Sequence, residues 1–178
     1  HFFYWTTNQS FMKFSDKVAV VIGAAKGIGR SVAVLFAKSG AKVAVVDIDE
    51  TEGANTAADI ISAGGDARFI RCDVGCESDI LQMIAEVTQT FGTIDILVND
   101  AALQLNKGLL ETTATEFGRV MDVNVTGIFL CTREAAKLMI AQKKGGAVVN
   151  FSSTFAVVGS PGDLAYHASK GAIASFTR

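Results

Sequence analysis

The sequence predicts an α/β protein built on a doubly wound parallel sheet. Short segments rich in β-branched residues alternate with longer segments of helical spacing, and several of the short segments are continuous apolar runs. Such runs are typical of strands that are buried on both faces, as the strands of parallel sheets are. Because parallel neighbours need a crossover between them, the alternation indicates right-handed strand–helix–strand units within one sheet.

Five strands are expected in chain order. They read KVAVVIG (17–23), AKVAVVD (41–47), DARFIRCD (66–73), IDILVND (94–100) and GAVVNFSS (146–153). Helical spacing predicts helices over 28–40, about 51–63, 77–91 and 114–143, and a last helix that opens near 163 and is still running at Arg178. Glycines, which commonly end helices, stand between these elements at Gly40, Gly64, Gly65, Gly92, Gly145 and Gly146.

The chain shows no internal repeat and no low-complexity linker, so we expect one domain over 12–178. Residues 1–11 read HFFYWTTNQSF and carry neither a basic leader nor a long apolar core, unlike a secretory signal. We interpret them as an extension that is not part of the fold. A cloning or gene-model artefact would explain them, and an aromatic docking tail is the alternative.

Composition narrows the class of protein. Hydrophobic residues make up 49% of the chain and charged residues 19%, which indicates a globular protein rather than a disordered one. Sixteen basic residues against eighteen acidic ones give a formal charge of −2, and no basic run exceeds Lys143-Lys144, so we expect no nucleic-acid partner. No apolar run approaches the roughly eighteen residues of a membrane span, so we expect no membrane partner.

The cysteines and histidines do not suggest a metal site. Cys72, Cys76 and Cys131 include no second cysteine pair, and His1 and His167 are the only histidines. A zinc site would need more ligands at closer spacing. We therefore expect reduced, mostly buried thiols and a cytoplasmic protein.

A glycine-rich turn, GAAKGIG, follows the first expected strand and precedes a helix. Its glycines, Gly23, Gly27 and Gly29, allow a tight turn and the close approach of a ligand, and the helix after them points N–H groups at an anion. The spacing differs from the common G-x-G-x-x-G dinucleotide pattern. Its place between a strand and a helix nevertheless favours a phosphate-binding turn over a plain connection.

Asp47 ends the second expected strand, 24 positions after Gly23. A carboxylate there can accept hydrogen bonds from both hydroxyls of an adenosine ribose and would repel a 2′-phosphate. The alternative role is a helix N-cap, which Asp49 or Thr51 could fill instead. Lys26 favours NADP, because a basic residue in the glycine turn can pair with a phosphate. Asp47 stands where the 2′ position would be, so NAD is favoured over NADP.

Five motifs together resemble the short-chain dehydrogenase/reductase family over Lys13 to Arg178. They are GAAKGIG, CDV (72–74), VNDAA (98–102), VNVTG (123–127) and FSS…YHASK (151–170), in the family's order and approximate spacing. The resemblance implies a Rossmann-type sheet. Family members continue through a sixth strand, a substrate-covering segment and a seventh strand, so it also implies a fold that is incomplete at the C-terminus.

The resemblance assigns catalytic roles. In such enzymes the tyrosine of Y-x-x-x-K is the acid/base, and the lysine favours its phenolate form and binds the nicotinamide ribose. These roles match Tyr166 and Lys170, which a helix would place on one face. Ser153 matches the serine that holds the substrate oxygen, with Ser152 as the alternative. Asn124 matches the asparagine that interrupts a long helix and fixes a water leading to the lysine.

The resemblance also assigns a cofactor site. The pair Asp73-Val74 matches residues that flank the adenine ring. The full set expected to contact NAD is Gly23, Lys26, Gly27, Ile28, Gly29, Asp47, Ile48, Asp73, Val74, Asn99, Ala101, Tyr166 and Lys170. The chain departs from the family pattern at Ile22, where threonine is usual, at Asp100, where an amide is usual, and at Ala102, where glycine is usual.

The implied function is hydride transfer between NAD(H) and a secondary alcohol or ketone, such as a sugar, a steroid or a similar small substrate. A homo-oligomer is expected for the full-length form. Two alternatives are a catalytically silent nucleotide-binding fragment and a dimerisation partner of a full-length relative. The activity of a chain that ends at Arg178 is left open.

Overall fold

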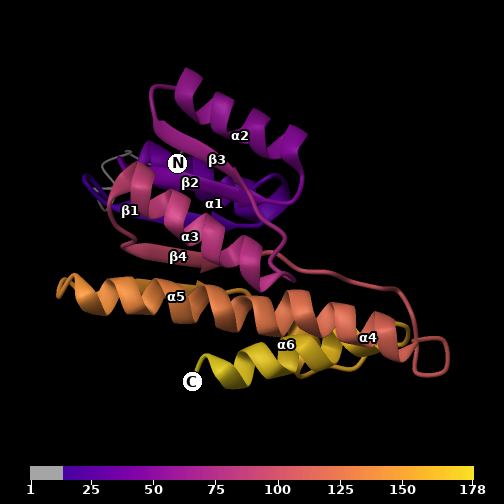
Figure 1. The fold of residues 1–178 in the computed structure, drawn as a ribbon. Coiled ribbons are helices and arrows are strands. Elements are labelled where there is room, and N and C mark those ends of the chain that lie inside the picture. The colour runs from indigo at the N-terminus through magenta and orange to yellow at the C-terminus, as the bar shows by residue number, and fades with distance from the viewer. Residues whose placement is uncertain (1–13) are drawn as a thin grey trace, which may run out of the picture.

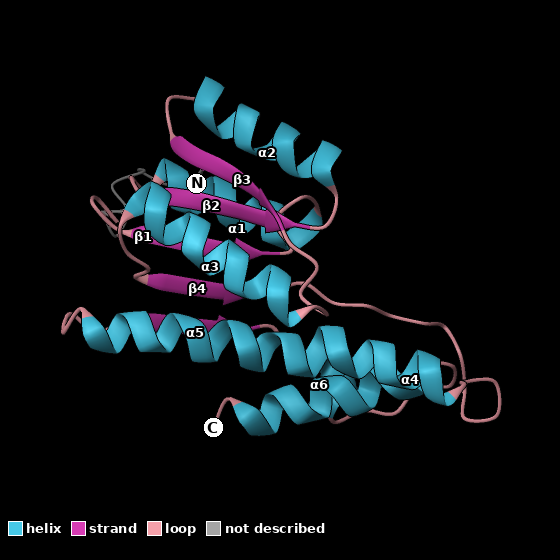
Figure 2. Ribbon diagram, viewed as in Figure 1, coloured by secondary structure: helices cyan, strands magenta, loops and turns pink. Residues whose placement is uncertain are grey.

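The computed structural model describes residues 14–178, and the expected extension over 1–11 lies outside this range. A single parallel sheet of five strands, in the order β3-β2-β1-β4-β5, forms its centre (Figures 1 and 2). The strands are β1 (Val18–Ile22), β2 (Lys42–Asp47), β3 (Asp66–Arg71), β4 (Ile96–Asn99) and β5 (Ala147–Asn150). The chain winds outward from β1 first in one direction and then in the other, so the predicted doubly wound α/β class is confirmed.

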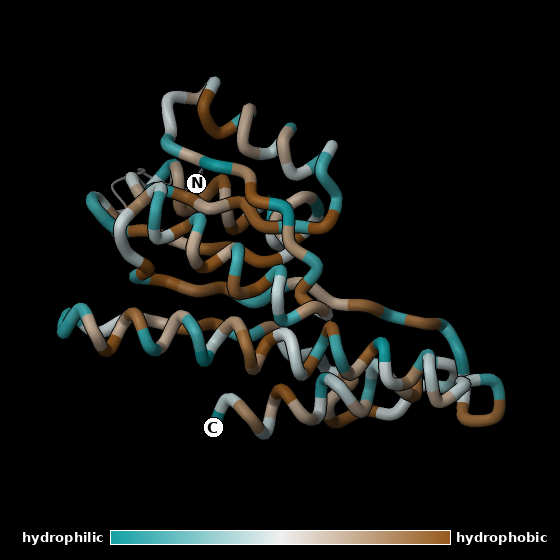
Figure 3. The backbone as a smooth tube through the Cα atoms, in the orientation of Figure 1, coloured by the Kyte–Doolittle hydropathy of each residue, from teal (hydrophilic) through white to brown (hydrophobic). Residues whose placement is uncertain are grey.

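Helices cover both faces of the sheet. They are α1 (Gly27–Lys38), α2 (Glu50–Ser62), α3 (Glu77–Phe91), α4 (Ala114–Met121), α5 (Ile128–Ala141) and α6 (Leu164–Phe176). Alternate residues of β1 and β2 pack in two separate apolar clusters, one with α1 and α2 and the other with α3 and α5. Every residue of β1 is buried, and Figure 3 shows the apolar character of the central strands. Burial on both faces explains why the strand sequence is apolar throughout.

The helix expected over 114–143 is modified in its middle. Residues Asp122–Gly127 form a π-helical segment between α4 and α5, and the helical run ends at Ala141. A π-helical turn inserts an extra residue into the hydrogen-bond ladder, which re-aims the side chains within it. Asn124 lies in this segment.

The last elements also differ from their expected bounds. Helix α6 ends at Phe176, with Thr177 as its C-cap, rather than running on at Arg178. Strand β5 is only four residues long and has no partner on its outer edge among residues 14–178, where Val149 is 46% exposed. Within the same range, no helix combines the length and apolar character that a membrane crossing requires.

Gly29, in the first turn of α1, is packed too tightly to carry any side chain. A Cβ on Gly29 would overlap the carbonyl oxygen of Gly23 and lie 3.0 Å from a carboxylate oxygen of Asp100. The backbone of the turn cannot yield as a flexible side chain can. Gly118, in α4, has no atom within 4 Å of the corresponding position.

We therefore expect Gly29→Ala to lower the free energy of unfolding by about 1–3 kcal/mol, the usual range for overpacking. Gly118→Ala is the matched control and should raise the free energy of unfolding by up to about 1 kcal/mol, because alanine favours the helix. Urea unfolding of both variants, followed by circular dichroism, measures the difference. A Gly29→Ala variant as stable as the unmodified chain would show that the turn can shift.

Candidate active site

The carboxyl ends of the strands meet at one edge of the sheet, and the predicted site residues gather there. At this edge the β1–α1 turn lies against the loop after β4. A Cβ on Gly23 would come within 2.6 Å of the backbone nitrogen of Ala101, and Gly23 has a positive φ of 84°. Glycine is therefore required at this position both by space and by conformation. The turn leaves the first N–H groups of α1 facing the edge.

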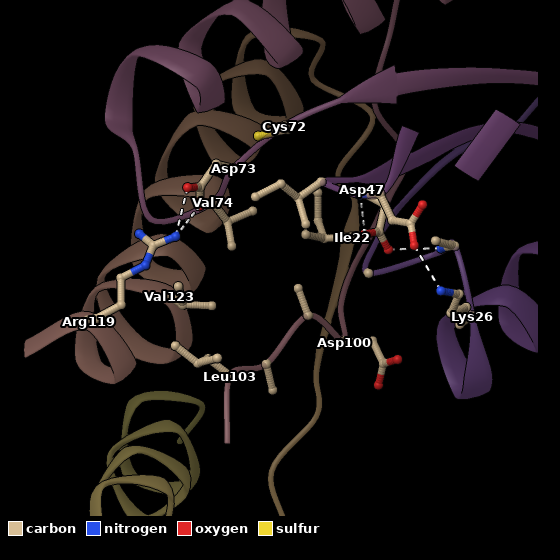
Figure 4. Close-up of a pocket in the computed structure, with 16 residues that line it drawn as sticks. Ile22, Lys26, Asp47, Cys72, Asp73, Val74, Asp100, Leu103, Arg119 and Val123 are labelled. Atoms are coloured by element: carbon tan, nitrogen blue, oxygen red, sulfur yellow. Dashed lines mark hydrogen bonds and ion pairs between the residues drawn. The ribbon is translucent and has the colours of Figure 1, made fainter. Parts of the chain in front are cut away.

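A cleft of about 490 Å³ opens beside this turn (Figure 4). Seven residues predicted to bind the cofactor line it: Gly23, Lys26, Asp47, Ile48, Asp73, Val74 and Ala101. Six others do not line it: Gly27, Ile28, Gly29, Asn99, Tyr166 and Lys170. Sequence reasoning did not place Cys72, Leu103, Arg119 or Val123 in the site, although all four line the cleft.

Asn99 is buried between structural elements instead of facing the cleft. Its amide nitrogen donates hydrogen bonds to Asn150 Oδ1 at 2.8 Å and to Thr132 Oγ1 at 3.3 Å. These bonds join β4 to β5 and α5. The predicted contact of its side chain with the cofactor therefore has no support from the cleft geometry.

Asp47 is held in place by the backbone on two sides. One carboxylate oxygen accepts a hydrogen bond from Ala25 N at 2.9 Å, and the other accepts one from Asp49 N at 3.0 Å. The alternative N-cap role falls to Asp49, whose side chain accepts a hydrogen bond from Glu52 N at the start of α2. Asp47 thus points into the cleft with its orientation fixed before any ligand binds.

Asp73 and Arg119 form a pair at the opposite end of the cleft. Arg119 Nη2 lies 2.7 Å and 3.0 Å from the two carboxylate oxygens of Asp73, and Gly75 N donates to the same carboxylate at 2.9 Å. Burial works against ionisation of Asp73, but these hydrogen bonds outweigh it and lower the pKa of the carboxyl. Arg119 precedes Val123 by one helical turn, so helical spacing was the available signal for both residues.

The pKa values of two further groups in the cleft are shifted. Burial raises the pKa of the Cys72 thiol to about 12, with the nearby Asp79 carboxylate adding to the effect, so this sulfur is neutral and not nucleophilic. Burial also raises the pKa of Asp100, while the backbone N–H of Gly29 and the Lys170 ammonium oppose the rise. A carboxylate therefore stands between the glycine turn and the lysine, where the family pattern has an amide.

Tyr166 and Lys170 lie one turn apart on α6. The Lys170 ammonium lies 5.4 Å from the centroid of the Tyr166 ring, within cation–π range, and donates a hydrogen bond to Phe151 O at 2.7 Å. Lys170 is 2% exposed, and its burial lowers the pKa of the ammonium, with Asp100 opposing. A solvated helix face would leave this lysine exposed, so the pair is not of that kind.

Three consecutive residues, the last of β5 and the two after it, tie α6 to the sheet. Asn150 Nδ2 donates to Thr177 Oγ1 at 3.1 Å, and Ser152 Oγ donates to the backbone oxygen of Lys170 at 2.9 Å. The bond from the Lys170 ammonium to Phe151 O lies between them. The Lys170 ammonium thus belongs to a set of contacts that extends from the middle of α6 to its C-cap.

Ser153 precedes a short 3-10 turn, Thr154–Ala156, that contacts α6. Ser153 Oγ accepts a hydrogen bond from Phe155 N at 3.2 Å, and the Phe155 ring packs edge-on against Tyr166. Among residues 14–178, no hydrogen bond joins the side chains of Ser153, Tyr166 and Lys170 directly. These side chains share one edge of the sheet, and the Lys170 ammonium is bonded to Phe151 O rather than to Ser153 or Tyr166.

Asn124 connects the loop after β4 to α6. Its Oδ1 accepts a hydrogen bond from Leu103 N at 2.7 Å, and its Nδ2 donates to Leu103 O and to Ser169 Oγ, each at 2.9 Å. Ser169 Oγ in turn donates to the backbone oxygen of Tyr166 at 2.7 Å. Both amide protons are used, so the side chain is locked. Leu103 lines the cleft, and Asn124 therefore links the cleft wall to the tyrosine's own turn of helix.

A second cavity of about 620 Å³ lies farther along the same edge. The loops after β4 and β5 and the start of α6 line it with Asn106, Gly108, Leu109, Leu110, Glu111, Ser160, Pro161, Gly162, Leu164 and His167. Leu109 is 73% exposed and Leu110 is 94% exposed. This region therefore presents exposed apolar side chains, and it is lined by His167, which follows Tyr166 in the chain.

Comparisons with known proteins agree with this geometry. Residues 17–178 match the family model described as short chain dehydrogenase. The chain is 41% identical over 167 residues to an uncharacterized oxidoreductase of Thermotoga maritima, covering 94% of this chain and 65% of the relative. It is 38% identical to a 3beta-hydroxysteroid dehydrogenase of Mediterraneibacter gnavus, covering 93% of this chain and 60% of that protein.

Solved structures give the same result. A short-chain dehydrogenase/reductase from Burkholderia phymatum, in complex with NAD, matches with a TM-score of 0.89 and 32% identity over 93% of this chain and 59% of its own. A short-chain type dehydrogenase/reductase from Mycobacterium marinum matches with a TM-score of 0.90 and 34% identity, over 94% of this chain and 66% of its own. The chain spans less than two thirds of each of these four relatives, and it belongs to the short-chain dehydrogenase/reductase family.

Proposed function

We propose that this chain is the dinucleotide-binding and catalytic part of an NAD-dependent oxidoreductase, which transfers a hydride between NAD(H) and a secondary alcohol or ketone. The observation that carries the proposal is the buried Lys170 ammonium, 5.4 Å from the Tyr166 ring at the same sheet edge as the cleft. Burying a lysine costs free energy unless its charge is used. The use proposed here is to favour the phenolate of Tyr166.

The cleft residues fit a dinucleotide. The close packing of Gly23 on the Ala101 backbone holds the β1–α1 turn at the cleft, where the first N–H groups of α1 can face a pyrophosphate. Each oxygen of the Asp47 carboxylate accepts one backbone hydrogen bond and keeps a lone pair for a ribose hydroxyl. When bound, NAD would supply the hydride acceptor, and Asp73 with Val74 would flank its adenine.

The remaining chemistry belongs to side chains of this chain. In oxidation of an alcohol, Tyr166 would take the hydroxyl proton and Ser153 would hold the same oxygen through its hydroxyl. Lys170 would stabilise the phenolate by its charge. Asn124 would hold α6 and the loop after β4 in register, as its contacts with Leu103 and Ser169 support.

The second cavity supports a substrate with apolar surface. Leu109 and Leu110 are exposed at this cavity, and His167 and Leu164 line it from the same helix as Tyr166. One relative is named a 3beta-hydroxysteroid dehydrogenase. A steroid or similar alcohol with a broad apolar face is therefore proposed over a fully polar sugar.

We expect the chain to bind NAD⁺ at least about tenfold more tightly than NADP⁺, a difference of about 1.4 kcal/mol, because Asp47 would repel a 2′-phosphate. Asp47→Ala should reduce this preference for NAD⁺ over NADP⁺ by a similar factor. Titration calorimetry with both dinucleotides measures it. Equal affinities in the unmodified chain would mean that Asp47 does not control the choice.

Tyr166→Phe should lower kcat by about 10²- to 10⁴-fold, the usual contribution of an acid/base, while the Kd for NAD⁺ changes little. Turnover is measured on a chimera, in which the C-terminal part of the Thermotoga maritima relative follows Arg178. Substantial remaining activity would rule out the role given to this phenol.

Lys170→Met should impair both turnover and NAD⁺ binding, because the ammonium has two proposed roles. Methionine keeps most of the side-chain volume and removes the charge. Turnover is again measured on the chimera, and the Kd for NAD⁺ is measured as for Tyr166→Phe. Loss of turnover with unchanged NAD⁺ binding would leave Lys170 with the phenolate role alone.

A further inference from the structure

The two basic side chains that line the cleft are both engaged by acids. Arg119 is paired with Asp73 at one end, and Lys26 is paired with Asp49 at the other, beside Asp47. Lys26 follows β1 and Asp49 follows β2. Because these parallel strands are neighbours, the turns after them lie at the same edge of the sheet and bring the two side chains together.

Lys26 and Asp49 form a close ion pair, in which the carboxylate is held in place by a further contact. Lys26 Nζ lies 2.8 Å from Asp49 Oδ2, and this hydrogen bond raises the pKa of the lysine and lowers that of the carboxyl. The other oxygen of Asp49 accepts a hydrogen bond from Glu52 N at 3.1 Å as the N-cap of α2. The helix therefore holds the carboxylate in place, whereas the lysine reaches it through a flexible stem.

We propose that Asp49 is a specificity-determining residue, which keeps the Lys26 ammonium away from the 2′-phosphate of NADP. This inference rests on the proposed binding of a dinucleotide in the cleft. Asp47 excludes the 2′-phosphate by direct repulsion, as proposed above. Asp49 acts on the one cation at that end of the cleft, among residues 14–178, that would otherwise attract the phosphate.

The exposure of the pair sets the size of the effect. Lys26 is 65% exposed in its side chain and Asp49 is 36% exposed, and ion pairs of this kind are weak. A 2′-phosphate carries more charge than a carboxylate and can compete for the lysine. The barrier that Asp49 adds is therefore modest, and we expect its removal to change affinity severalfold rather than by orders of magnitude.

Asp49→Asn separates the two roles of this residue. Asparagine is a good N-cap, so α2 keeps its start, but the amide has no charge to hold Lys26. We expect binding of adenosine 2′,5′-bisphosphate to strengthen about three- to tenfold relative to 5′-AMP, both measured by titration calorimetry. The two ligands differ only in the 2′-phosphate, so their comparison isolates its contribution. The affinity for NADP⁺ relative to NAD⁺ should rise as well.

Two further variants make the result specific to this pair. Glu52→Gln removes the same charge from the first turn of α2, but Glu52 makes no side-chain bond to Lys26 in the described chain, so the ratio should change by less than about twofold. Adding Lys26→Gln to Asp49→Asn should cancel the gain. Thermal melting of each variant checks that the fold is kept.

The inference is overturned if Glu52→Gln strengthens 2′-phosphate binding as much as Asp49→Asn does, because the cause is then the general charge of the helix. It is also overturned if the gain survives Lys26→Gln, or if Asp49→Asn gives no gain while the unmodified chain binds NAD⁺. Failure of the unmodified chain to bind either NAD⁺ or 5′-AMP would instead remove the proposed function, and this inference with it.

Discussion

The complete burial of β1 is the constraint on which the rest of the structure depends. Its five residues are covered on both faces, and its backbone groups are paired with β2 on one side and β4 on the other. A strand with no free surface and no free backbone can contribute to function only where it ends. The turn after Ile22 is that end, and the cleft forms around it. The same reasoning applies to β2, whose last residue is Asp47.

Asn124 has a comparable role for the other half of the site. A side chain that is fully buried must satisfy its polar atoms, and Asn124 does so with Leu103 on one side and Ser169 on the other. The π-helical segment turns this residue toward both partners. The distance between the cleft wall and the Tyr166 turn is thus set by one amide group, so the nucleotide cleft and the acid/base pair are positioned together.

Much of this arrangement was predictable from the sequence, and the reasons for the exceptions are physical. Apolar runs and glycine positions predicted the succession of strands and helices along the chain. The four-residue spacing of Tyr166 and Lys170 predicted that they share one face of a helix. The partners of the charged groups were not predictable, because Arg119 and Asp73 are far apart in the sequence, as are Lys26 and Asp49. Only the folded arrangement of the strands and helices brings each pair together. Asn99 was expected at the cofactor because VNDAA resembles a motif of the family, but its side chain points to Asn150 and α5. Neither propensity nor periodicity determines which way a strand-end side chain turns.

The three contacts that join residues 150–152 to α6 make the helix and the edge strand one mechanical unit. Phe151 O receives the Lys170 ammonium directly after the last residue of β5, so any displacement of β5 moves the acceptor of that charge. The outer edge of β5 carries unpaired backbone groups within residues 14–178. A strand that adds to this edge would therefore act on the lysine through the sheet, at a distance from the cleft and without touching any residue that lines it.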